Sequence, residues 1–386
     1  MKTVCAQSVL RGQEAFLTLG EVLVLPDRKI RREDLLDADA LILRSKTRVD
    51  ARLVSGTSVR FVGTATAGFD HIDGSALNQA GIAWTAAPGC NANSVAEYVA
   101  AALLRMSRRH AWPLAGRTLG LIGVGQVGRR VAQKATALGM RVLLNDPPRK
   151  LAEPENADLL PLADILPQCD VVSLHVPLSE DPPFATRTMA GIRFFEQLNP
   201  GAWFINASRG EVVDEQALRL ALDAETVPHA VLDVWNLEPR IDPALVKRAD
   251  LSTPHIAGYS IDGKLKGTLQ VYEEACRFFE CPATWNPAKG ESLPPPPDLR
   301  FNPAGQEDEA SLDDIVRLVY DIEQDDAALR SAAGQGADIL ATEFERLRKT
   351  YPNRREFYNI QVRLTGSHRT LETSLCGLGF RVQPHP

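Results

Sequence analysis

Two histidines near the ends of apolar runs are the groups in this chain best suited to acid–base chemistry. The chain has seven histidines, and His175 and His255 each stand where an expected parallel strand ends. Open α/β sheets bind their ligands beyond the carboxyl ends of such strands. Histidine titrates near neutral pH, so it can exchange a proton with a hydroxyl group. The pattern alone favours the two histidines about equally, and one of them is expected to be a packing residue.

A glycine-rich turn supplies a second kind of chemistry, the binding of a pyrophosphate. Gly123, Gly125 and Gly128 directly follow an apolar run and open an amphipathic helical pattern. The first glycine permits a tight turn, the second lets the backbone approach the pyrophosphate, and the third lets helix and strand pack closely. The phosphates would then lie at the helix N-terminus, where free N–H groups favour negative charge.

Asp146 decides which dinucleotide the turn is expected to bind. It ends the second strand candidate, RVLLN, of the unit that the glycine turn begins. An acidic side chain at this point hydrogen-bonds the 2′-hydroxyl of the ribose and repels a 2′-phosphate. NAD is therefore expected rather than NADP, although Arg149 and Lys150 follow closely and could soften the discrimination.

The elements that must position these groups form an α/β pattern. Short apolar runs at 22–26, 40–45 and 59–65 predict buried strands, and the spacing predicts a helix over 93–110 that Asn93 or Ser94 can cap. From Thr118 onward, six further strand candidates are TLGLI, RVLLN, DVVSLHV, AWFINA, AVLDV and DLSTPH, with helical patterns between most of them. This series predicts a right-handed, doubly wound parallel sheet.

The last third of the chain has a different rhythm. A helical pattern covers 261–280, and the polyproline stretch LPPPPD is typical of a stiff linker. Beyond it, helical patterns at 312–325 and 337–350 precede the strand-like runs FYNIQVRLT and LGFRVQ. We expect a small third domain of the α+β class here.

Composition excludes several classes of protein. The 386 residues are 44% apolar and 24% charged with a net charge of −6, which is typical of a globular protein and argues against a large nucleic-acid surface. Apolar runs are far shorter than the roughly 18 residues that span a membrane, and the N-terminus lacks a signal-peptide pattern, so we expect a cytoplasmic protein. The six cysteines form no CxxC pair, so free thiols and no metal site are expected.

Three segments carry a resemblance to a known family. INASRGEVVDEQAL, AVLDVWNLEP and TPHIAGYS stand in this order around the late strands. Together they resemble the signature segments of the D-isomer-specific 2-hydroxyacid dehydrogenases, over roughly residues 40–285. The resemblance implies that Arg209 binds and polarises a 2-oxo acid, that Glu238 orients an imidazole, and that His255 is the acid–base group. His175 would then line the cofactor side.

Elementary chemistry agrees with these implied roles. The planar fork of Arg209 matches the carboxylate of a 2-hydroxy acid, and its charge stabilises negative charge that develops on the neighbouring oxygen. A carboxylate on the other ring nitrogen of His255 would fix its tautomer and stabilise the imidazolium. A surface ion pair is the alternative for Arg209 and Glu238.

Finer segments resemble one branch of this family. They are SKTRVD, GTATAGFDHID, APGCNANSVAEYV, PHIAGYSIDGKLKGT and LRKTYPNRREF. Members of that branch oxidise a phosphorylated 2-hydroxy acid with NAD and carry an extra C-terminal dimerisation domain. Substrate contacts are thereby implied for Ser45, Thr66 and Tyr259, and further cofactor contacts for Gln126, Val127, Ala207, Ser208, Asp233 and Gly258. Two positions depart from the family pattern, with Asn236 where an acidic residue is frequent and Glu215 where Asn is common.

The expected fold is α/β, with a Rossmann-type doubly wound sheet inserted in a second, flavodoxin-like α/β domain. The boundaries implied are 1–92 with 257–290 for a substrate (lid) domain, 93–256 for the NAD-binding domain, and 298–386 for the small C-terminal dimerisation domain. Expected partners are a phosphorylated hydroxy acid and a second copy of the chain, with no nucleic acid and no membrane. The alternatives are a sibling enzyme acting on 3-phosphoglycerate or another 2-hydroxy acid, and an NAD-sensing scaffold that resembles the corepressors built on this fold.

Overall fold

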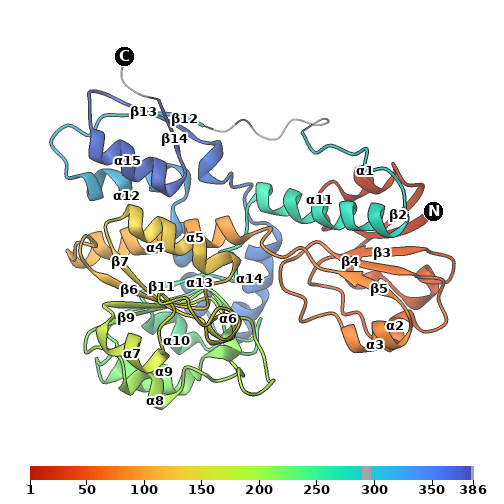
Figure 1. The fold of residues 1–386 in the computed structure, drawn as a ribbon, viewed down its shortest axis with the longest axis horizontal. Coiled ribbons are helices and arrows are strands. Elements are labelled where there is room, and N and C mark those ends of the chain that lie inside the picture. The colour runs from red at the N-terminus through yellow and green to blue at the C-terminus, as the bar shows by residue number, and fades with distance from the viewer. Residues whose placement is uncertain (289–294, 296, 384–386) are drawn as a thin grey trace. The chain divides into compact units, whose positions relative to one another are not determined.

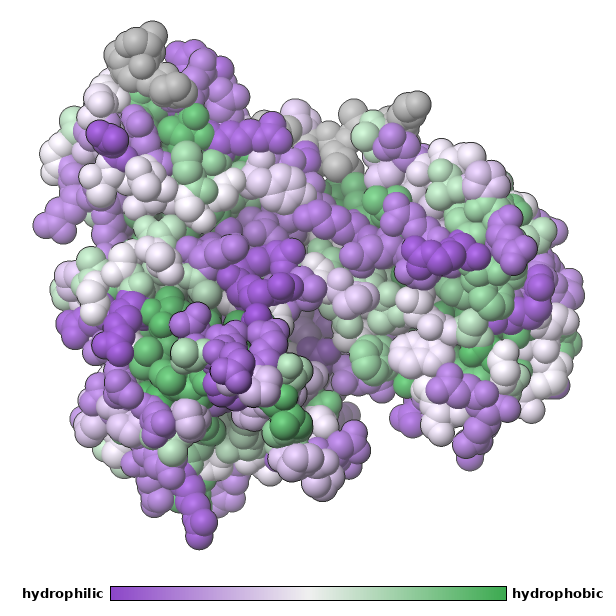
Figure 2. Space-filling model, viewed as in Figure 1, coloured by the Kyte–Doolittle hydropathy of each residue, from purple (hydrophilic) through white to green (hydrophobic). Residues whose placement is uncertain are grey.

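The computed structural model describes residues 1–288, 295 and 297–383 (Figure 1). It divides into two compact units, of which unit 1 comprises residues 1–91 and 260–295, and unit 2 comprises 92–259 and 296–386. Half of the expected polyproline linker, residues 293, 294 and 296, lies outside the described residues. On the face shown in Figure 2, apolar residues are interspersed with polar ones, as is usual for a globular surface.

Unit 1 is built around a five-stranded parallel sheet in the order β2-β1-β3-β4-β5. The strands are β1 Lys2–Ala6, β2 Glu21–Leu25, β3 Ala40–Leu43, β4 Phe61–Thr64 and β5 Ala83–Thr85. Its helices are α1 Gly12–Phe16, α2 Ala51–Val54, α3 Gly74–Gln79 and α11 Ile261–Phe278, with 3₁₀ turns at Asp27–Lys29 and Arg32–Leu35. This strand order is the flavodoxin-like one, as the sequence predicted.

Unit 2 contains a six-stranded parallel sheet in the order β11-β10-β9-β8-β6-β7. Its strands are β6 Thr118–Ile122, β7 Arg141–Asn145, β8 Val171–Leu174, β9 Trp203–Asn206, β10 Ala230–Leu232 and β11 Leu251–Ser252. Outside β7, Leu159 forms a parallel bridge with Leu144, at the place of the third strand of a Rossmann sheet. The predicted doubly wound sheet is confirmed.

Helices cover both faces of this sheet (Figure 1). They are α4 Ala92–His110, α5 Gln126–Ala137, α6 Pro147–Ala152, α7 Leu162–Ile165, α8 Ile192–Glu196, α9 Glu215–Asp223 and α10 Pro243–Arg248, with 3₁₀ turns at Leu166–Gln168 and Gly210–Val212. Adjacent strand residues point to opposite faces, so Val171 joins the core with α4 and α5, whereas Val172 joins the core with α8, α9 and α10. Both faces of the strands are therefore buried, which explains their continuous apolar runs.

The start of α4 differs from the expectation. The helix begins at Ala92, so Asn93 and Ser94 lie in its first turn and do not cap it. Their side chains bind carboxylates instead: the Asn93 amide donates to Glu97 at 2.7 Å, and the Ser94 hydroxyl donates to Glu356 at 2.6 Å. The polar residues that suggested a cap thus belong to a buried network with the C-terminal segment.

The C-terminal segment, residues 296–386, carries a three-stranded parallel sheet in the order β12-β13-β14. The strands are β12 Asp298–Phe301, β13 Gln361–Leu364 and β14 Arg381–Gln383, and the helices are α12 Asp308–Val319, α13 Ile322–Ala333, α14 Ala337–Lys349 and α15 Arg369–Leu378, with a 3₁₀ turn at Phe357–Asn359. The expected single helix over 312–325 is wrong. It is interrupted at Tyr320, because the Asp321 side chain accepts from the backbone N–H of Glu323 and starts a second helix.

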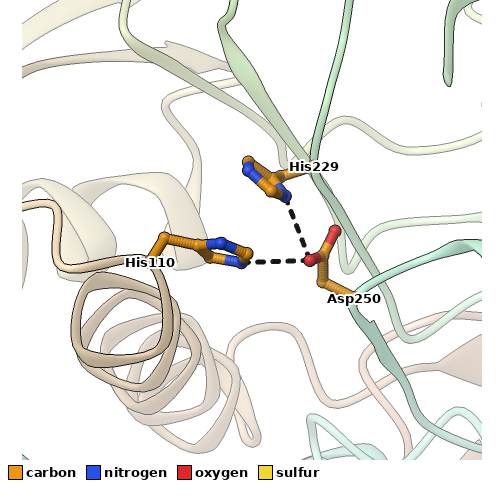
Figure 3. A group of neighbouring side chains, drawn as sticks. All are labelled: His110, His229 and Asp250. Atoms are coloured by element: carbon orange, nitrogen blue, oxygen red, sulfur yellow. Dashed lines mark hydrogen bonds and ion pairs between the residues drawn. The ribbon is translucent and has the colours of Figure 1, made fainter. Parts of the chain in front are cut away.

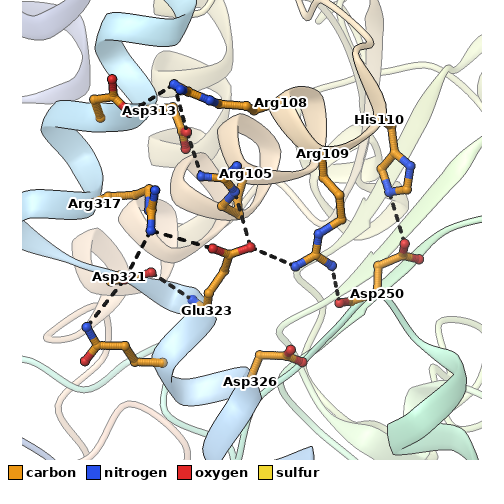
Figure 4. Close-up of polar contacts among 12 residues, drawn as sticks. Arg105, Arg108, Arg109, His110, Asp250, Asp313, Arg317, Asp321, Glu323 and Asp326 are labelled. Carbon is orange, nitrogen blue, oxygen red and sulfur yellow. Dashed lines mark hydrogen bonds and ion pairs between the residues drawn. The ribbon is translucent and has the colours of Figure 1, made fainter.

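Ion pairs attach α12 and α13 to the end of α4 (Figure 4). Arg105 contacts Asp313 at 2.8 Å, and Arg109 contacts Glu323 at 2.9 Å. Further along, a carboxylate oxygen of Asp326 on α13 accepts from the backbone N–H of Ser252 in β11 at 2.7 Å. The C-terminal segment is thus packed directly on the core of unit 2.

A buried charge network makes the same connection. Arg354 lies 3.5 Å from Glu97 on α4, and both side chains are almost wholly buried. Burial raises the pKa of Glu97 to about 7, against the lowering effect of Arg354 and Lys134. The backbone N–H of Phe357 donates to the same carboxylate at 2.7 Å. Removing either partner would leave a buried charge without compensation.

In the described part of the chain, none of the helices has the length and apolar character needed to cross a membrane.

Candidate active site

The glycine turn has the geometry of a pyrophosphate cradle. Gly123 has a φ of +91°, and a Cβ there would lie 2.6 Å from the carbonyl oxygen of His175. A Cβ on Gly128 would lie 2.1 Å from the Gly123 carbonyl oxygen, so α5 packs against the turn. A Cβ on Gly125, in contrast, would meet nothing within 4 Å. The open side of the turn is therefore at Gly125, where the α5 residues Gln126 and Val127 begin the helix. This cradle fits a dinucleotide.

Asp146 is fastened to the cradle. One carboxylate oxygen accepts from the backbone N–H of Val124 at 2.8 Å, and the other accepts from that of Arg149 at 3.0 Å. Arg149 itself pairs with Glu153 at 3.0 Å, and Lys150 donates to two backbone carbonyl oxygens. The two cations that could soften the preference for NAD are thus engaged by protein acceptors, and Asp146 keeps a carboxylate beside the turn.

His175 lies directly after β8, under the glycine turn. Its Nε2 bonds the Ser173 hydroxyl at 2.9 Å, while its buried Nδ1 has no hydrogen-bond partner. Burial lowers the pKa of His175 to about 3. A ring that stays neutral at physiological pH is a poor general acid, so these surroundings favour the packing or cofactor-side role over the acid–base role.

The other proposed groups follow three neighbouring strands. Arg209 comes after β9, Glu238 after β10 and His255 after β11, and these strands are adjacent in the parallel sheet. Their carboxyl ends therefore meet at one edge. Ala207 and Ser208 stand in the loop between β9 and Arg209, where Arg209 donates to the Ser208 carbonyl at 2.8 Å.

The structure brings Glu238 and His255 together. The distance from Glu238 Oε2 to His255 Nδ1 is 2.7 Å, which is that of a strong charge-assisted hydrogen bond. Burial alone would raise the pKa of Glu238, but His255, Arg348 and the Trp235 N–H hold it below its usual range. Glu238 is therefore an anion that fixes the ring and leaves Nε2 for proton exchange.

Asp233 holds the turn that carries His255. Its side chain is 1% exposed and accepts from the Thr253 hydroxyl at 2.7 Å and from the backbone N–H groups of Ile256 and Ala257 at 2.8 and 3.0 Å. His255 has a φ of +55°, which non-glycine residues seldom adopt unless their surroundings enforce it. Asp233, expected at the cofactor, thus has both carboxylate oxygens engaged in supporting this turn, which continues through Gly258.

Two further residues, Asn206 and Trp235, support the site and were not predicted from the sequence. The Asn206 side chain accepts from Ser208 and donates to the Arg209 carbonyl at 2.9 Å, which shapes the loop before Arg209. Trp235 donates to the Thr253 carbonyl at 2.9 Å, below the His255 turn. The asparagine in the INASRG run was the available signal.

The remaining substrate candidates are distributed over both units. Ser45 follows β3 and Thr66 follows β4, both at carboxyl ends of strands in unit 1. The Thr66 hydroxyl bonds the Thr64 hydroxyl at 2.7 Å and the Gly68 carbonyl at 2.8 Å. Tyr259 is the last residue of the first stretch of unit 2, and its carbonyl accepts from Arg354 at 3.2 Å.

The two departures from the family pattern contact one another. The backbone N–H of Asn236 donates to the Glu215 carboxylate at 2.7 Å. Burial raises the pKa of Glu215 to about 7, an effect to which the neighbouring Glu238 contributes. The Glu215 carboxylate thus lies against the backbone of position 236.

A separate group, His110, His229 and Asp250, has the donor types of a metal site (Figure 3). Both imidazoles bond one Asp250 oxygen, at 3.1 Å from His110 and 3.0 Å from His229. The group lies before β10 and β11, at the sheet edge opposite the proposed acid–base pair. These bonds tie the end of α4 to the residues that precede β10 and β11, which is a structural role.

Two glycine substitutions should separate folding from cofactor binding. Gly128→Ala should lower stability by about 1–3 kcal/mol, because its Cβ would collide with the backbone of Gly123. Gly125→Ala should cost less stability but weaken NAD binding at least about tenfold, because its methyl group fills the space expected for the pyrophosphate. Melting temperatures and calorimetric NAD titrations test both. Unchanged NAD affinity in Gly125→Ala would place the pyrophosphate elsewhere.

Glu215→Gln should stabilise the protein in a pH-dependent way. The pKa of Glu215 is raised on folding, so the native state loses stability as pH rises from about 4.5 to about 7. A neutral Gln avoids that loss, and we expect a gain of about 1–3 kcal/mol at pH 8 that nearly vanishes at pH 5. Denaturant unfolding at both pH values measures it, with the exposed Glu196→Gln as control. An equal gain at both pH values would contradict the prediction.

Comparison with known proteins agrees with this geometry. Residues 91–257 match the family model of the D-isomer specific 2-hydroxyacid dehydrogenase, NAD binding domain, and residues 293–379 match a domain of unknown function, DUF3410. Residues 91–257 thus form an NAD-binding domain, and the expected cofactor is confirmed.

Curated relatives extend the likeness to the whole chain. The erythronate-4-phosphate dehydrogenase of Salmonella schwarzengrund (strain CVM19633) is 43% identical, and that of Klebsiella pneumoniae (strain 342) is 42% identical, each over 100% of both chains. Among solved structures, the NAD-bound 3-phosphoglycerate dehydrogenase of Entamoeba histolytica is 26% identical with a TM-score of 0.62, over 72% of this chain and 95% of that one. The chain therefore belongs to the D-isomer specific 2-hydroxyacid dehydrogenase family.

Proposed function

We propose that this protein oxidises 4-phospho-D-erythronate at C2 to 2-oxo-3-hydroxy-4-phosphobutanoate, with NAD as acceptor, in the biosynthesis of pyridoxal 5′-phosphate. The observation that carries the chemistry is the 2.7 Å bond between Glu238 and His255 at the carboxyl edge of an NAD-binding sheet. The choice of substrate rests on the relatives named erythronate-4-phosphate dehydrogenase. This chain is similar to them over the full length of both sequences.

The proposed roles follow from the charges and positions. The glycine cradle would hold NAD, which would supply the acceptor for the hydride on C2 of the substrate. His255 takes the hydroxyl proton at Nε2, since Nδ1 is held by Glu238. Arg209 holds the substrate carboxylate and stabilises negative charge on the C2 oxygen as it becomes a carbonyl. The anionic Glu238 stabilises the imidazolium that results.

We assign the remaining predicted residues by the family resemblance. Ser45, Thr66 and Tyr259 contact the substrate, and the cofactor contacts are Gly123, Gly125, Gln126, Val127, Gly128, Asp146, His175, Ala207, Ser208, Asp233 and Gly258. In this proposal, residues 1–92 with 257–290 form the substrate (lid) domain, 93–256 the NAD-binding domain, and 298–386 a dimerisation domain. We further propose that the protein is cytoplasmic and works as a homodimer, the commonest assembly.

Histidine substitutions test the acid–base assignment. His255→Ala should lose about 10²–10⁴-fold in kcat, the usual size of a general acid–base contribution, with NAD affinity nearly unchanged. His175→Ala should mainly weaken NAD binding. Steady-state kinetics with calorimetric NAD titrations distinguish the two variants. If His175→Ala lost the turnover and His255→Ala retained it, the roles of the two histidines would be reversed.

A substrate panel tests the specificity. 4-Phospho-D-erythronate should exceed 3-phosphoglycerate and D-lactate in kcat/KM by about 10²-fold or more. D-lactate lacks the phosphate whose binding energy helps orientation at C2. 3-Phosphoglycerate is one carbon shorter, and a misplacement of about 1 Å can cost on the order of 10²-fold. The assay follows NADH for each acid. Equal or better turnover of 3-phosphoglycerate would leave the dehydrogenase class standing and overturn the specific assignment.

A further inference from the structure

The end of helix α14 and the residues after it hold the loop that follows His255. Arg354 donates from Nε to the Tyr259 carbonyl at 3.2 Å and from Nη2 to the Ala257 carbonyl at 3.4 Å. The ring of Tyr351 meets the ring of Tyr259 edge-on, with centroids 5.6 Å apart and an interplanar angle of 87°. The C-terminal segment therefore supports both the backbone and a side chain of the proposed substrate loop.

Arg348 reaches the acid–base pair itself. Its Nη1 lies 3.9 Å from Glu238 Oε2, the same oxygen that bonds His255. That distance is too long for a hydrogen bond, so the contact acts through charge. The guanidinium group also lies 5.9 Å from the Tyr259 ring centroid and 5.7 Å from that of Phe344. Its Nε is buried without a hydrogen-bond partner, so this cation is not placed there by a complete set of hydrogen bonds.

We propose that Arg348 is a positioning residue of the dehydrogenase reaction, through which the C-terminal segment adjusts the Glu238–His255 pair. The proposal rests on the function proposed above, since it takes His255 as the proton acceptor. Residues 293–379 match only a domain of unknown function. The proposal gives this region a part in catalysis in addition to its proposed part in dimerisation.

The expected effect follows from the charges around the pair. Asp233, from the loop after β10, interacts electrostatically with His255, and Glu215, from α9, interacts with Glu238. Arg348 from α14 opposes them, and Tyr259 lies against its guanidinium group. A cation beside Glu238 keeps that carboxylate ionised and makes the imidazolium less stable. Replacing Arg348 with a neutral residue is therefore expected to favour the imidazolium form of the pair.

The test is the pH profile of kcat/KM for oxidation by the full-length protein. In Arg348→Gln and Arg348→Met, the acid limb should move up by about 0.5–1 pH unit, the order of magnitude expected when one charge beside the pair is removed. The rate near pH 7 should fall several-fold with little change in the KM for NAD. Arg348→Lys keeps the charge and should restore the limb. Arg346→Gln on the same helix is the matched control, because Arg346 is 54% exposed and pairs only with Glu343 among its described ion pairs.

Each outcome decides the proposal. A folded Arg348→Met or Arg348→Gln protein with the wild-type acid limb would overturn it, as would an activity loss that leaves the limb in place and is not restored by lysine. Should neutral variants fail to fold, a lysine variant whose limb moves as far as expected for charge removal would also overturn it.

A second measurement needs no turnover. NMR titration of the His255 ring, assigned by its absence in His255→Asn, should show a higher pKa in Arg348→Met than in the wild type. If the wild type failed to oxidise 4-phospho-D-erythronate while this difference was present, the substrate assignment would fail and the role of Arg348 would stand. An identical ring titration in both proteins would refute the role of Arg348.

Discussion

The geometry of the proposed active centre depends on one buried carboxylate. Asp233 places both of its oxygens under a single turn, where they accept from Thr253, Ile256 and Ala257. Those three bonds oblige His255 to adopt a left-handed backbone conformation that a histidine would not choose alone. The conformation in turn delivers Nδ1 to Glu238. A buried acid thereby supports the orientation of the partly buried His255 ring. Burial raises the pKa of Asp233, and its hydrogen bonds oppose that effect.

The same turn is connected to the rest of unit 2 through Thr253. The Tyr98 hydroxyl on α4 lies 2.8 Å from the Thr253 hydroxyl, and the Trp235 ring nitrogen donates to the Thr253 carbonyl. Both aromatic side chains are fully buried. Helix α4 therefore contacts the turn before His255 through Thr253, and α14 contacts Glu238 through Arg348. Precision at the site is a property of the packed core, in which a small shift of α4 would be felt at His255.

Local patterns predicted most of this architecture, because they report short-range constraints. The strands of the six-stranded sheet are continuous apolar runs, and the roles of Gly123 and Gly128 follow from the backbone path of one turn. The pairing of Glu238 with His255 needed the family resemblance, since 17 positions separate the two residues. Spacing alone does not reveal such a contact.

Apart from the local cap that Asp321 forms within 312–325, the differences from prediction have their origin in long-range pairing. Asn93 and Ser94 look like caps until Glu356 is present, and the strand β12 becomes recognisable only beside β13. Arg348 and Arg354 belong to the segment LRKTYPNRREF, which in the sequence indicated only a resemblance, yet they contact groups of the loop that follows His255 and its partner Glu238. In each case a polar residue acquires its role from a partner far along the chain, which the local periodicity of the sequence does not encode.

The bond between Glu97 and Arg354 has a consequence for the order in which the molecule can be made. The two residues are 257 positions apart, so α4 emerges from the ribosome long before its buried carboxylate can be neutralised. Until then Glu97 must stay hydrated or protonated, and the helix cannot settle fully on the sheet. The NAD-binding fold is thus completed only after Arg354 has been synthesised, and a chain terminated before this residue would carry a destabilised cofactor domain.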